Sequence, residues 1–376
     1  MTSVVAGQGA LTGWSIRVDH RARAAHCPRA EGRRDAPDVP YPLRCSTMSL
    51  LSVKDLELGF ETPAGRVHAV NGISYTVEPG EIVAIVGESG SGKTVAAQAV
   101  LGLIPQPPGE IIGGRVEFDG EDLLGLSEQQ MRTIRGRRIS MVFQEPMTSL
   151  NPVLSIGRQM TEAMRLHLGV TREAAEQRAV ALLGMVGIAD PGRRLRQFPH
   201  HLSGGMRQRV MIAIAIACEP VLIIADEPTT ALDVTIQAQI LALMQDLTRR
   251  LGVALVIITH NLGVVARYAD RVNVMYAGRI VEHGRADSVY RRPGHPYTIG
   301  LLNSVPRLDR PRDVPIEPIP GSPPDPSWLP PGCAFAPRCQ HAVERCRSEV
   351  PPAVRFEGGH TARCWQTAVT RPETGR

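Results

Sequence analysis

The residues best suited to chemistry form a glycine-rich loop between an apolar stretch, residues 81–86, and a helix-forming stretch, residues 95–103. Glycines let backbone N–H groups turn inward around phosphate oxygens, and the helix N-terminus adds positive potential. In this spacing the lysine binds the β- and γ-phosphates, and the hydroxyl after it is a ligand of Mg²⁺. The loop therefore predicts a nucleoside triphosphate site. Its residues are Gly87, Glu88, Ser89, Gly90, Ser91, Gly92, Lys93 and Thr94.

Two carboxylates, Asp226 and Glu227, follow a second apolar run, residues 221–225. Ligands of open α/β sheets bind at the C-terminal ends of the strands, so both side chains would face the phosphates. We expect Asp226 to hold Mg²⁺ through water and Glu227 to polarise the attacking water as general base. A simple helix N-cap is the alternative, but the Pro-Thr-Thr sequence that follows suits a turn.

The elements that must position these groups are buried parallel strands, which the apolar runs at residues 221–225 and 253–258 predict. Both runs are far shorter than the roughly 20 residues that a membrane helix needs. Residues 1–47 also lack the apolar core of a signal peptide. We therefore expect a cytosolic protein that reaches a membrane only through a partner.

Composition narrows the class further. With 376 residues the chain is long enough for about two domains. Its net charge of +5 is mild, and acidic and basic residues are mixed, which indicates a solvated surface and not a nucleic acid partner. Lysine occurs only at Lys54 and Lys93, so its presence in the glycine loop is notable.

Residues 1–47 are rich in Arg, Ala, Pro and small polar residues without clear periodicity, and we expect disorder there. The first strand pattern begins directly after Met48. The simplest interpretation is that Met48 is the true start and that the preceding residues are an upstream extension. A targeting or regulatory arm is the alternative.

The string Leu202–Gln208, LSGGMRQ, lies downstream of the glycine loop and resembles the signature of ATP-binding subunits of ABC transporters. In that family the signature closes the ATP site of the partner subunit across a dimer. Its serine, Ser203, is placed to cap a helix over residues 206–217, whose N-terminus would face anionic phosphate. An acidic residue is common in the family at the position of His201. The resemblance implies ATP contacts from Ser203, Gly204, Gly205 and Gln208.

The resemblance extends over residues 50–285 and implies four further roles. Gln144 corresponds to the glutamine that touches Mg²⁺ and the attacking water, in a loop that contacts a membrane subunit. Asp233 ends the Ala-Leu-Asp loop of the dimer interface, and His260 corresponds to the histidine that contacts the γ-phosphate. Phe60 corresponds to an aromatic that stacks on adenine. For single residues of these types, ordinary surface or strand positions are the alternative.

The same resemblance implies the fold class. It is an α/β P-loop NTPase (RecA-like) core with an ABC-type antiparallel β part and an inserted α-helical subdomain at about residues 146–214. We therefore expect an ATP-binding domain over residues 48–285. Residues 286–376 would form a smaller C-terminal domain, because the composition changes there.

Two elements of that C-terminal part resemble the ATPases of oligopeptide and dipeptide permeases: residues 292–298, RPGHPYT, and residues 319–325, IPGSPPD. The latter element is similar to that of the D-type ATPase of these systems, which implies a heterodimer with a related ATPase; a homodimer is the alternative. The subfamily implies two membrane permease subunits, an extracytoplasmic solute-binding protein and a place on the cytoplasmic face of the inner membrane. Nickel and glutathione are alternatives to peptide as the solute.

Four of the seven cysteines cluster near the end of the chain. A cytosolic protein is not expected to keep structural disulfides, and the spacing is not a usual zinc pattern. Four thiolates suit a [4Fe–4S] cluster, which members of this subfamily with this C-terminal part carry; zinc and free thiols remain alternatives. Cys218, in an apolar stretch, is expected in the core. The clustered residues are Cys333, Cys339, Cys346 and Cys364.

The sequence thus predicts an ATPase that drives import by ATP-dependent dimer closure and contacts with membrane subunits. A soluble ABC ATPase acting on ribosomes or DNA is the rival class, but such proteins usually carry two cassettes or a long coiled coil. A regulator that binds ATP without hydrolysis is a third hypothesis. The presence of both Glu227 and His260 argues against it.

Overall fold

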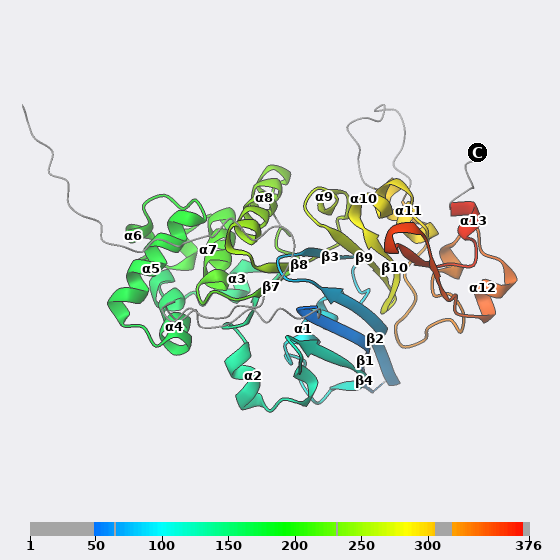
Figure 1. The fold of residues 1–376 in the computed structure, drawn as a ribbon, viewed down its shortest axis with the longest axis horizontal. Coiled ribbons are helices and arrows are strands. Elements are labelled where there is room, and N and C mark those ends of the chain that lie inside the picture. The colour runs from blue at the N-terminus through cyan, green and yellow to red at the C-terminus, as the bar shows by residue number, and fades with distance from the viewer. Residues whose placement is uncertain (1–48, 64, 231, 305–317, 371–376) are drawn as a thin grey trace, which may run out of the picture. The chain divides into compact units, whose positions relative to one another are not determined.

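An eight-stranded sheet organises the part of the chain that the computed structural model describes, residues 49–63, 65–230, 232–304 and 318–370. The predicted disordered segment and Met48 lie outside these residues. The strand order is β11-β12-β10-β9-β3-β8-β7-β6, and the five strands from β9 to β6 run parallel (Figure 1). The strands are β3 (Ile82–Val86), β6 (Ile139–Val142), β7 (Leu222–Asp226), β8 (Ala254–Thr259), β9 (Arg271–Tyr276), β10 (Arg279–Arg285), β11 (Ala353–Arg355) and β12 (Thr361–Arg363).

The strands that carry the predicted site are buried along their whole length. Every residue of β3, β7 and β8 is buried, as expected for parallel strands covered on both faces. Successive side chains alternate between two apolar layers: Val83 and Ile85 join one layer, and Ile82 joins the other. The predicted strands are confirmed to within a residue at their ends.

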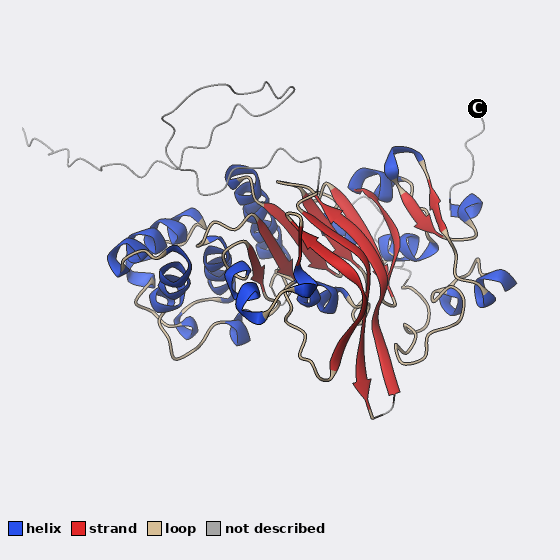
Figure 2. Cartoon of the chain, turned by 60° about the horizontal axis from the view of Figure 1, so that its bottom comes forward, coloured by secondary structure: helices blue, strands red, loops and turns tan. Residues whose placement is uncertain are grey.

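An antiparallel sheet of order β2-β1-β4-β5 covers one face of the central sheet (Figure 2). Its buried side chains share a core with the first helix and with β3, β7 and β8. Phe60 lies half-buried near the end of β1, opposite Gly109. The elements of this layer are β1 (Leu51–Thr62), β2 (Gly65–Val77), α1 (Lys93–Val100), β4 (Gly109–Phe118), β5 (Glu121–Asp122), η1 (Leu123–Gly125) and α2 (Glu128–Ile134).

The opposite face packs against α8 (Val234–Leu251) and a helical lobe, which we define as residues 146–216. Met160 and Met164 lie fully buried in the lobe. Ser155, Thr171 and Ser203 accept N–H groups as side-chain N-caps of three of its helices. The elements of the lobe are α3 (Pro146–Ser149), α4 (Ile156–Leu168), α5 (Arg172–Met185), α6 (Pro191–Arg194), η2 (Pro199–His201) and α7 (Gly204–Ile216).

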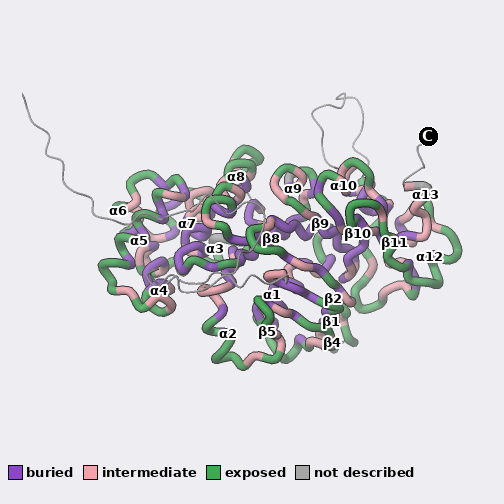
Figure 3. The backbone as a smooth tube through the Cα atoms, in the orientation of Figure 1, coloured by how far each residue is buried: buried purple, intermediate pink, exposed green. Residues whose placement is uncertain are grey.

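The C-terminal region, defined as residues 286–304 and 318–370, packs on the other end of the sheet, where β12 pairs with β10 and β11 pairs with β12. A third apolar cluster joins it to β3 and β9 through Tyr276, Tyr297 and Phe335. Figure 3 shows these buried stretches in purple, beside the exposed rim of α12. A short helix, α9 (Leu262–Val265), precedes this region in the chain. The helices of the region are α10 (Ala286–Arg291), α11 (Pro296–Asn303), η3 (Ala336–Arg338), α12 (Glu344–Ser348), η4 (Glu357–Gly359) and α13 (Thr367–Thr370).

Some predicted helix limits shift in the structure. The helix after the glycine loop begins at Lys93, because Gly92 with φ of 95° ends the loop, and it closes at Val100. The signature helix begins at Gly204, directly after its Ser203 cap, and ends at Ile216. Cys218 therefore lies just beyond the helix, buried as predicted. Within the described ranges, no helix is long and apolar enough to cross a membrane.

Candidate nucleotide site

The glycine loop connects β3 to α1 at the C-terminal ends of the parallel strands. Two of its glycines pass so close to neighbouring backbone that a side chain would not fit. A Cβ on Gly87 would lie 2.1 Å from the Met275 carbonyl oxygen. A Cβ on Gly92 would lie 2.3 Å from the Ala69 carbonyl oxygen. At the tip of the loop, backbone N–H groups stay accessible, because Ser89 and Gly90 are exposed.

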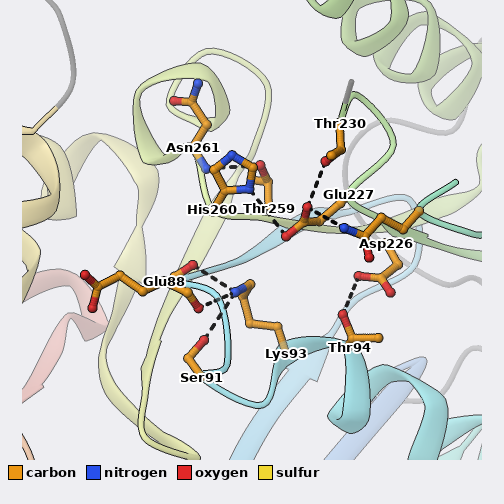
Figure 4. Close-up of polar contacts among 12 residues, drawn as sticks. Glu88, Ser91, Lys93, Thr94, Asp226, Glu227, Thr230, Thr259, His260 and Asn261 are labelled. Atoms are coloured by element: carbon orange, nitrogen blue, oxygen red, sulfur yellow. Dashed lines mark hydrogen bonds and ion pairs between the residues drawn. The ribbon is translucent and has the colours of Figure 1, made fainter. Parts of the chain in front are cut away.

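Lys93 folds back over this loop and is buried (Figure 4). Its Nζ donates to the carbonyl oxygens of Gly87 and Glu88, both at 2.8 Å, and to Ser91 Oγ at 3.2 Å. Burial lowers the pKa of the lysine, while the carboxylates at the end of β7 act in the opposite direction. The three donors of the ammonium thus point at the loop itself, where phosphate oxygens of a bound nucleotide would replace the carbonyls.

Two of the three predicted Mg²⁺ ligands, Thr94 and Asp226, lie together, while the third, Gln144, bonds to Glu227. Thr94 Oγ1 donates to Asp226 Oδ1 at 3.0 Å across the gap between α1 and β7 (Figure 4). Burial raises the pKa of the Asp226 carboxyl, and the hydrogen bond from Thr94 partly offsets this. A hydroxyl and a carboxylate are the hard oxygen ligands that Mg²⁺ prefers in nucleotide sites. The donor set therefore fits the ion.

Glu227 is the point on which the predicted catalytic residues converge. Its carboxylate accepts from Gln144 Nε2 at 3.0 Å and from Thr230 Oγ1 at 2.7 Å, and His260 Nδ1 lies 3.4 Å from it (Figure 4). Its backbone has φ of 43°, a left-handed conformation that is rare for glutamate and costs energy. Its N–H donates to the carbonyl of Ile258 on β8, which holds this turn in place.

The signature residues lie on the helical lobe. Ser203 Oγ accepts the Met206 N–H at 3.4 Å, so the serine caps α7 as predicted, and its side chain is exposed. No hydrogen bond or ion pair within the described ranges joins Ser203 to the glycine loop or to Glu227. Gln208 is buried, and its amide nitrogen has no partner among the described residues.

Gly204 and Gly205 pack against the start of α8. A Cβ on Gly204 would lie 3.5 Å from Leu232 Cδ2, and a Cβ on Gly205 would lie 3.2 Å from Ile236 Cγ2. Asp233 stands at the N-terminus of α8 without making a side-chain cap, and it is exposed. The signature therefore lies beside the segment with Asp233, and of these residues Ser203 and Asp233 are exposed.

The four clustered cysteines line one small cavity in the C-terminal region. They are free thiols, and burial raises the pKa of three of them, that of Cys364 to about 11. In the described part of the chain, no three His, Cys, Asp or Glu side chains are arranged to hold one metal ion. Four thiols around one cavity are the type of ligand that a four-iron cluster takes.

Comparison with known proteins agrees with this geometry. Residues 70–230 match the family model "ABC transporter", and residues 281–346 match "Oligopeptide/dipeptide transporter, C-terminal region". The oligopeptide transport ATP-binding protein OppD of Bacillus subtilis is 52% identical over 316 residues, covering 84% of this chain and 88% of the relative. The dipeptide transport ATP-binding protein DppD of the same organism is 50% identical, covering 84% of this chain and 94% of that protein.

A solved dimeric bacterial ABC transporter cassette is similar in structure, with a TM-score of 0.57 and 27% identity, covering 63% of this chain and 98% of the cassette. Fold and site are those of an ABC-type ATPase. The chain belongs to the family of ATP-binding subunits of oligopeptide and dipeptide ABC transporters. The predicted family, fold class and ATPase activity are confirmed.

Thr230 is a functional candidate that the sequence did not single out. It was expected only as part of a turn, yet its hydroxyl is a closer partner of Glu227 than Gln144 or His260. The signal was present in the spacing, because a threonine three residues after a carboxylate can reach back to it across a turn. Phe60 lies half-buried beside Gly109, and its stacking on adenine stays a prediction.

Proposed function

We propose that this chain binds and hydrolyses ATP at the loop between β3 and α1 and so powers peptide import by an ABC transporter. The observation that carries the proposal is the convergence of Gln144, Thr230 and His260 on the Glu227 carboxylate, beside Thr94 and Asp226. Such a cluster can hold an attacking water and take its proton. The names of the peptide-transporting relatives support the solute class.

In this proposal the loop N–H groups and Lys93 bind the phosphates, and Phe60 stacks on the adenine. Thr94, Gln144 and Asp226 would hold Mg²⁺, which neutralises charge on the phosphates. Glu227 polarises the water, Gln144 and Thr230 fix the direction of its carboxylate, and His260 contacts the γ-phosphate. The hydrogen bonds already present around Glu227 support this division of roles.

The active form in this proposal is a dimer in which the signature of one subunit closes the ATP site of the other. The exposed Ser203 at the N-terminus of α7 supports it, because an uncovered helix end is suited to anionic phosphate. Asp233 would line the same interface. Similar solved cassettes are dimers. We favour a heterodimer with a related ATPase, and a homodimer is the alternative.

Coupling would run through the loop that contains Gln144, at the cytoplasmic face of the inner membrane. Two exposed apolar side chains lie near this loop in the sequence: Phe143, directly before Gln144, at 41% of full exposure, and Val153, after α3, at 76%. They offer a surface for the two membrane permease subunits, which would work with an extracytoplasmic solute-binding protein. Exposed apolar side chains can mark a surface on which a partner docks.

The substitution Glu227→Gln tests the catalytic assignment. We expect ATP binding and ATP-dependent dimerisation to persist while turnover falls about 10²–10⁴-fold, because a general base is lost. Glu110→Gln, at an exposed carboxylate of β4, is the matched control and should keep normal turnover. Steady-state hydrolysis at the normal rate in Glu227→Gln would refute the role of this residue.

Uptake of labelled di- and oligopeptides by cells that carry Glu227→Gln in place of the normal chain tests the solute. Lost uptake supports a peptide importer powered by this site. If uptake persists while turnover is lost, either the cells have a second peptide importer or peptide is not the solute of this system, and nickel and glutathione uptake become the next measurements.

We also propose that Cys333, Cys339, Cys346 and Cys364 hold a [4Fe–4S] cluster, which would crosslink this part of the chain. Iron and acid-labile sulfide in protein purified without oxygen give the test. We expect both in the normal chain, a loss in Cys339→Ser, and no change in Cys218→Ser, whose thiol lies in a different core. Zinc in place of iron, or neither element, would overturn the assignment.

A further inference from the structure

We propose that Arg338 in the C-terminal region is a positioning residue for ATP binding: it neutralises Glu88, the carboxylate inside the glycine loop. The inference rests on the proposed place of the triphosphate in that loop. It assigns to the C-terminal region a part in the nucleotide site itself, although Glu88 and Arg338 are 250 positions apart in the sequence.

The contact between the two side chains is a two-pronged ion pair. Arg338 Nη1 lies 2.7 Å from Glu88 Oε2, and Nη2 lies 3.0 Å from Oε1. A planar guanidinium matches a carboxylate in this way with both directions fixed. The arginine side chain is 5% exposed and the glutamate side chain 28% exposed, so the pair is shielded from solvent on the arginine side.

The guanidinium is itself held from several sides. Its Nε donates to the Pro320 carbonyl oxygen at 2.8 Å, and Nη1 also donates to Tyr276 Oη at 3.3 Å. The rings of Tyr276 and Phe335 lie 5.8 Å and 5.9 Å from its central carbon. Arg338 is therefore fixed by the fold before a nucleotide arrives. The entropy cost of ordering its side chain falls on folding and not on nucleotide binding.

A second contact holds the backbone of the same loop residue. The Glu88 N–H donates to Tyr297 Oη at 2.8 Å, and Tyr297 is fully buried on α11. The side chain and the N–H of Glu88 thus both bond to residues of the C-terminal region. Because Lys93 Nζ donates to the Glu88 carbonyl, the direction of this residue also decides where the ammonium lies.

Electrostatics gives the reason for the pair. A carboxylate in a loop that receives a triphosphate repels its ligand unless a cation compensates it. Lys93 is the cation that would bind the phosphates. Because Arg338 forms a bidentate ion pair with Glu88, the lysine does not have to neutralise that carboxylate. Without Arg338, we expect the glutamate to compete for the ammonium and to weaken ATP binding.

The test compares Arg338→Gln with the normal chain in the assembled transporter. We expect KM for ATP to rise about tenfold, the scale for a charged hydrogen-bonded pair, while kcat changes less than about threefold. In a Glu88→Gln background, where no charge needs compensation, Arg338→Gln should have little further effect on KM. An unchanged KM in the single variant, or an equal rise in both backgrounds, would overturn the proposal.

Three further variants separate local from general effects. Arg345→Gln removes another arginine–glutamate pair of the same region, on exposed α12, and should leave KM unchanged. Tyr297→Phe removes the acceptor of the Glu88 N–H and should raise KM, whereas Tyr290→Phe removes a similar acceptor from Ala266 and should not. If Arg338→Gln fails to fold, the charge-retaining Arg338→Lys replaces it, with a smaller rise expected.

Lys93→Ala distinguishes failure of this inference from failure of the proposed function. Unchanged ATP affinity in Lys93→Ala would mean that the triphosphate does not occupy the loop, so both proposals fall. Weakened affinity in Lys93→Ala together with an unchanged KM in Arg338→Gln would overturn the inference alone.

Discussion

The helical lobe and the C-terminal region flank the same sheet, but the polar residues that matter for the site are exposed on the lobe and buried in the C-terminal region. The lobe carries Ser203 on its surface, with no hydrogen bond in the described structure to the catalytic groups of its own chain. The C-terminal region carries Tyr297 and Arg338 inside, and both bond to Glu88 of the glycine loop. In the proposed function, the lobe acts on another subunit, whereas the C-terminal region acts within the chain.

The two flanks also fold by different means. The lobe consists of capped helices that pack around apolar side chains such as Met160, so its exposed polar residues are not needed for its core. The C-terminal region is fastened by buried polar contacts, of which the Glu282 carboxylate is the centre. That carboxylate accepts from the N–H groups of Gly294 and His295, at 2.6 Å and 2.9 Å, and lies 2.7 Å from His360 Nε2.

The largest effect should follow from breaking that fastening. Glu282→Ala removes the acceptor of two buried N–H groups and a buried ion-pair partner of His360, which we expect to cost about 3–5 kcal/mol of stability. Chemical denaturation measures this loss. If the C-terminal region supports the glycine loop, ATP affinity at temperatures below unfolding falls as well.

Glu349→Ala is the matched control for this prediction, because it removes an exposed carboxylate that pairs with Arg345 in the same region. We expect less than about 1 kcal/mol from it. Equal costs for the two variants would show that the buried carboxylate is not what holds the C-terminal region, and the contrast between the two flanks would lose its basis.

A smaller effect is expected from pH. Burial lowers the pKa of His295 to about 4, from an ordinary value of 6.5. The unfolded chain thus binds a proton that the folded chain refuses, and this contribution to stability is complete above pH 6.5 and declines as the pH falls toward 4. The full difference is about 3 kcal/mol, of which about 2 kcal/mol is lost by pH 5.

His295→Asn tests this titration, because the His295 ring nitrogen Nδ1 caps α11 by accepting the Tyr297 N–H, and an asparagine oxygen can replace it without titrating. We expect the free energy of unfolding of the normal chain to fall more steeply between pH 7 and pH 5 than that of the variant. Parallel pH profiles would contradict the prediction.

The nucleotide site was predictable because its residues lie in short local patterns. The glycine loop, the carboxylates after β7 and the histidine after β8 each end an apolar strand, and parallel strands bring such ends together. Even the capping serine of α7 could be placed from its position before two glycines. For these elements the local sequence and the fold require the same residues.

The contacts of the C-terminal region were not predictable in this way. Arg338 and Glu88 are far apart in the chain, and nothing in an arginine before a cysteine indicates a partner in the glycine loop. The cavity shared by the four cysteines likewise depends on how irregular segments pack. Helix ends differed for a related reason: glycine and cap geometry set them, and hydrophobic periodicity does not.

The smallest effect concerns the helical lobe and tests whether its signature acts outside its own chain. Ser203→Ala and Thr171→Ala each remove one N-cap, of α7 and of α5, and each should cost about 1 kcal/mol of stability. Only Ser203→Ala should weaken ATP-dependent dimerisation, by about tenfold, since only this hydroxyl is proposed to reach phosphate in the partner site. Sedimentation measures the dimerisation of both variants in a Glu227→Gln background, where we expect closed dimers to accumulate. Equal dimerisation of the two variants would mean that Ser203 serves its own helix alone, and the outward-facing flank would need another explanation.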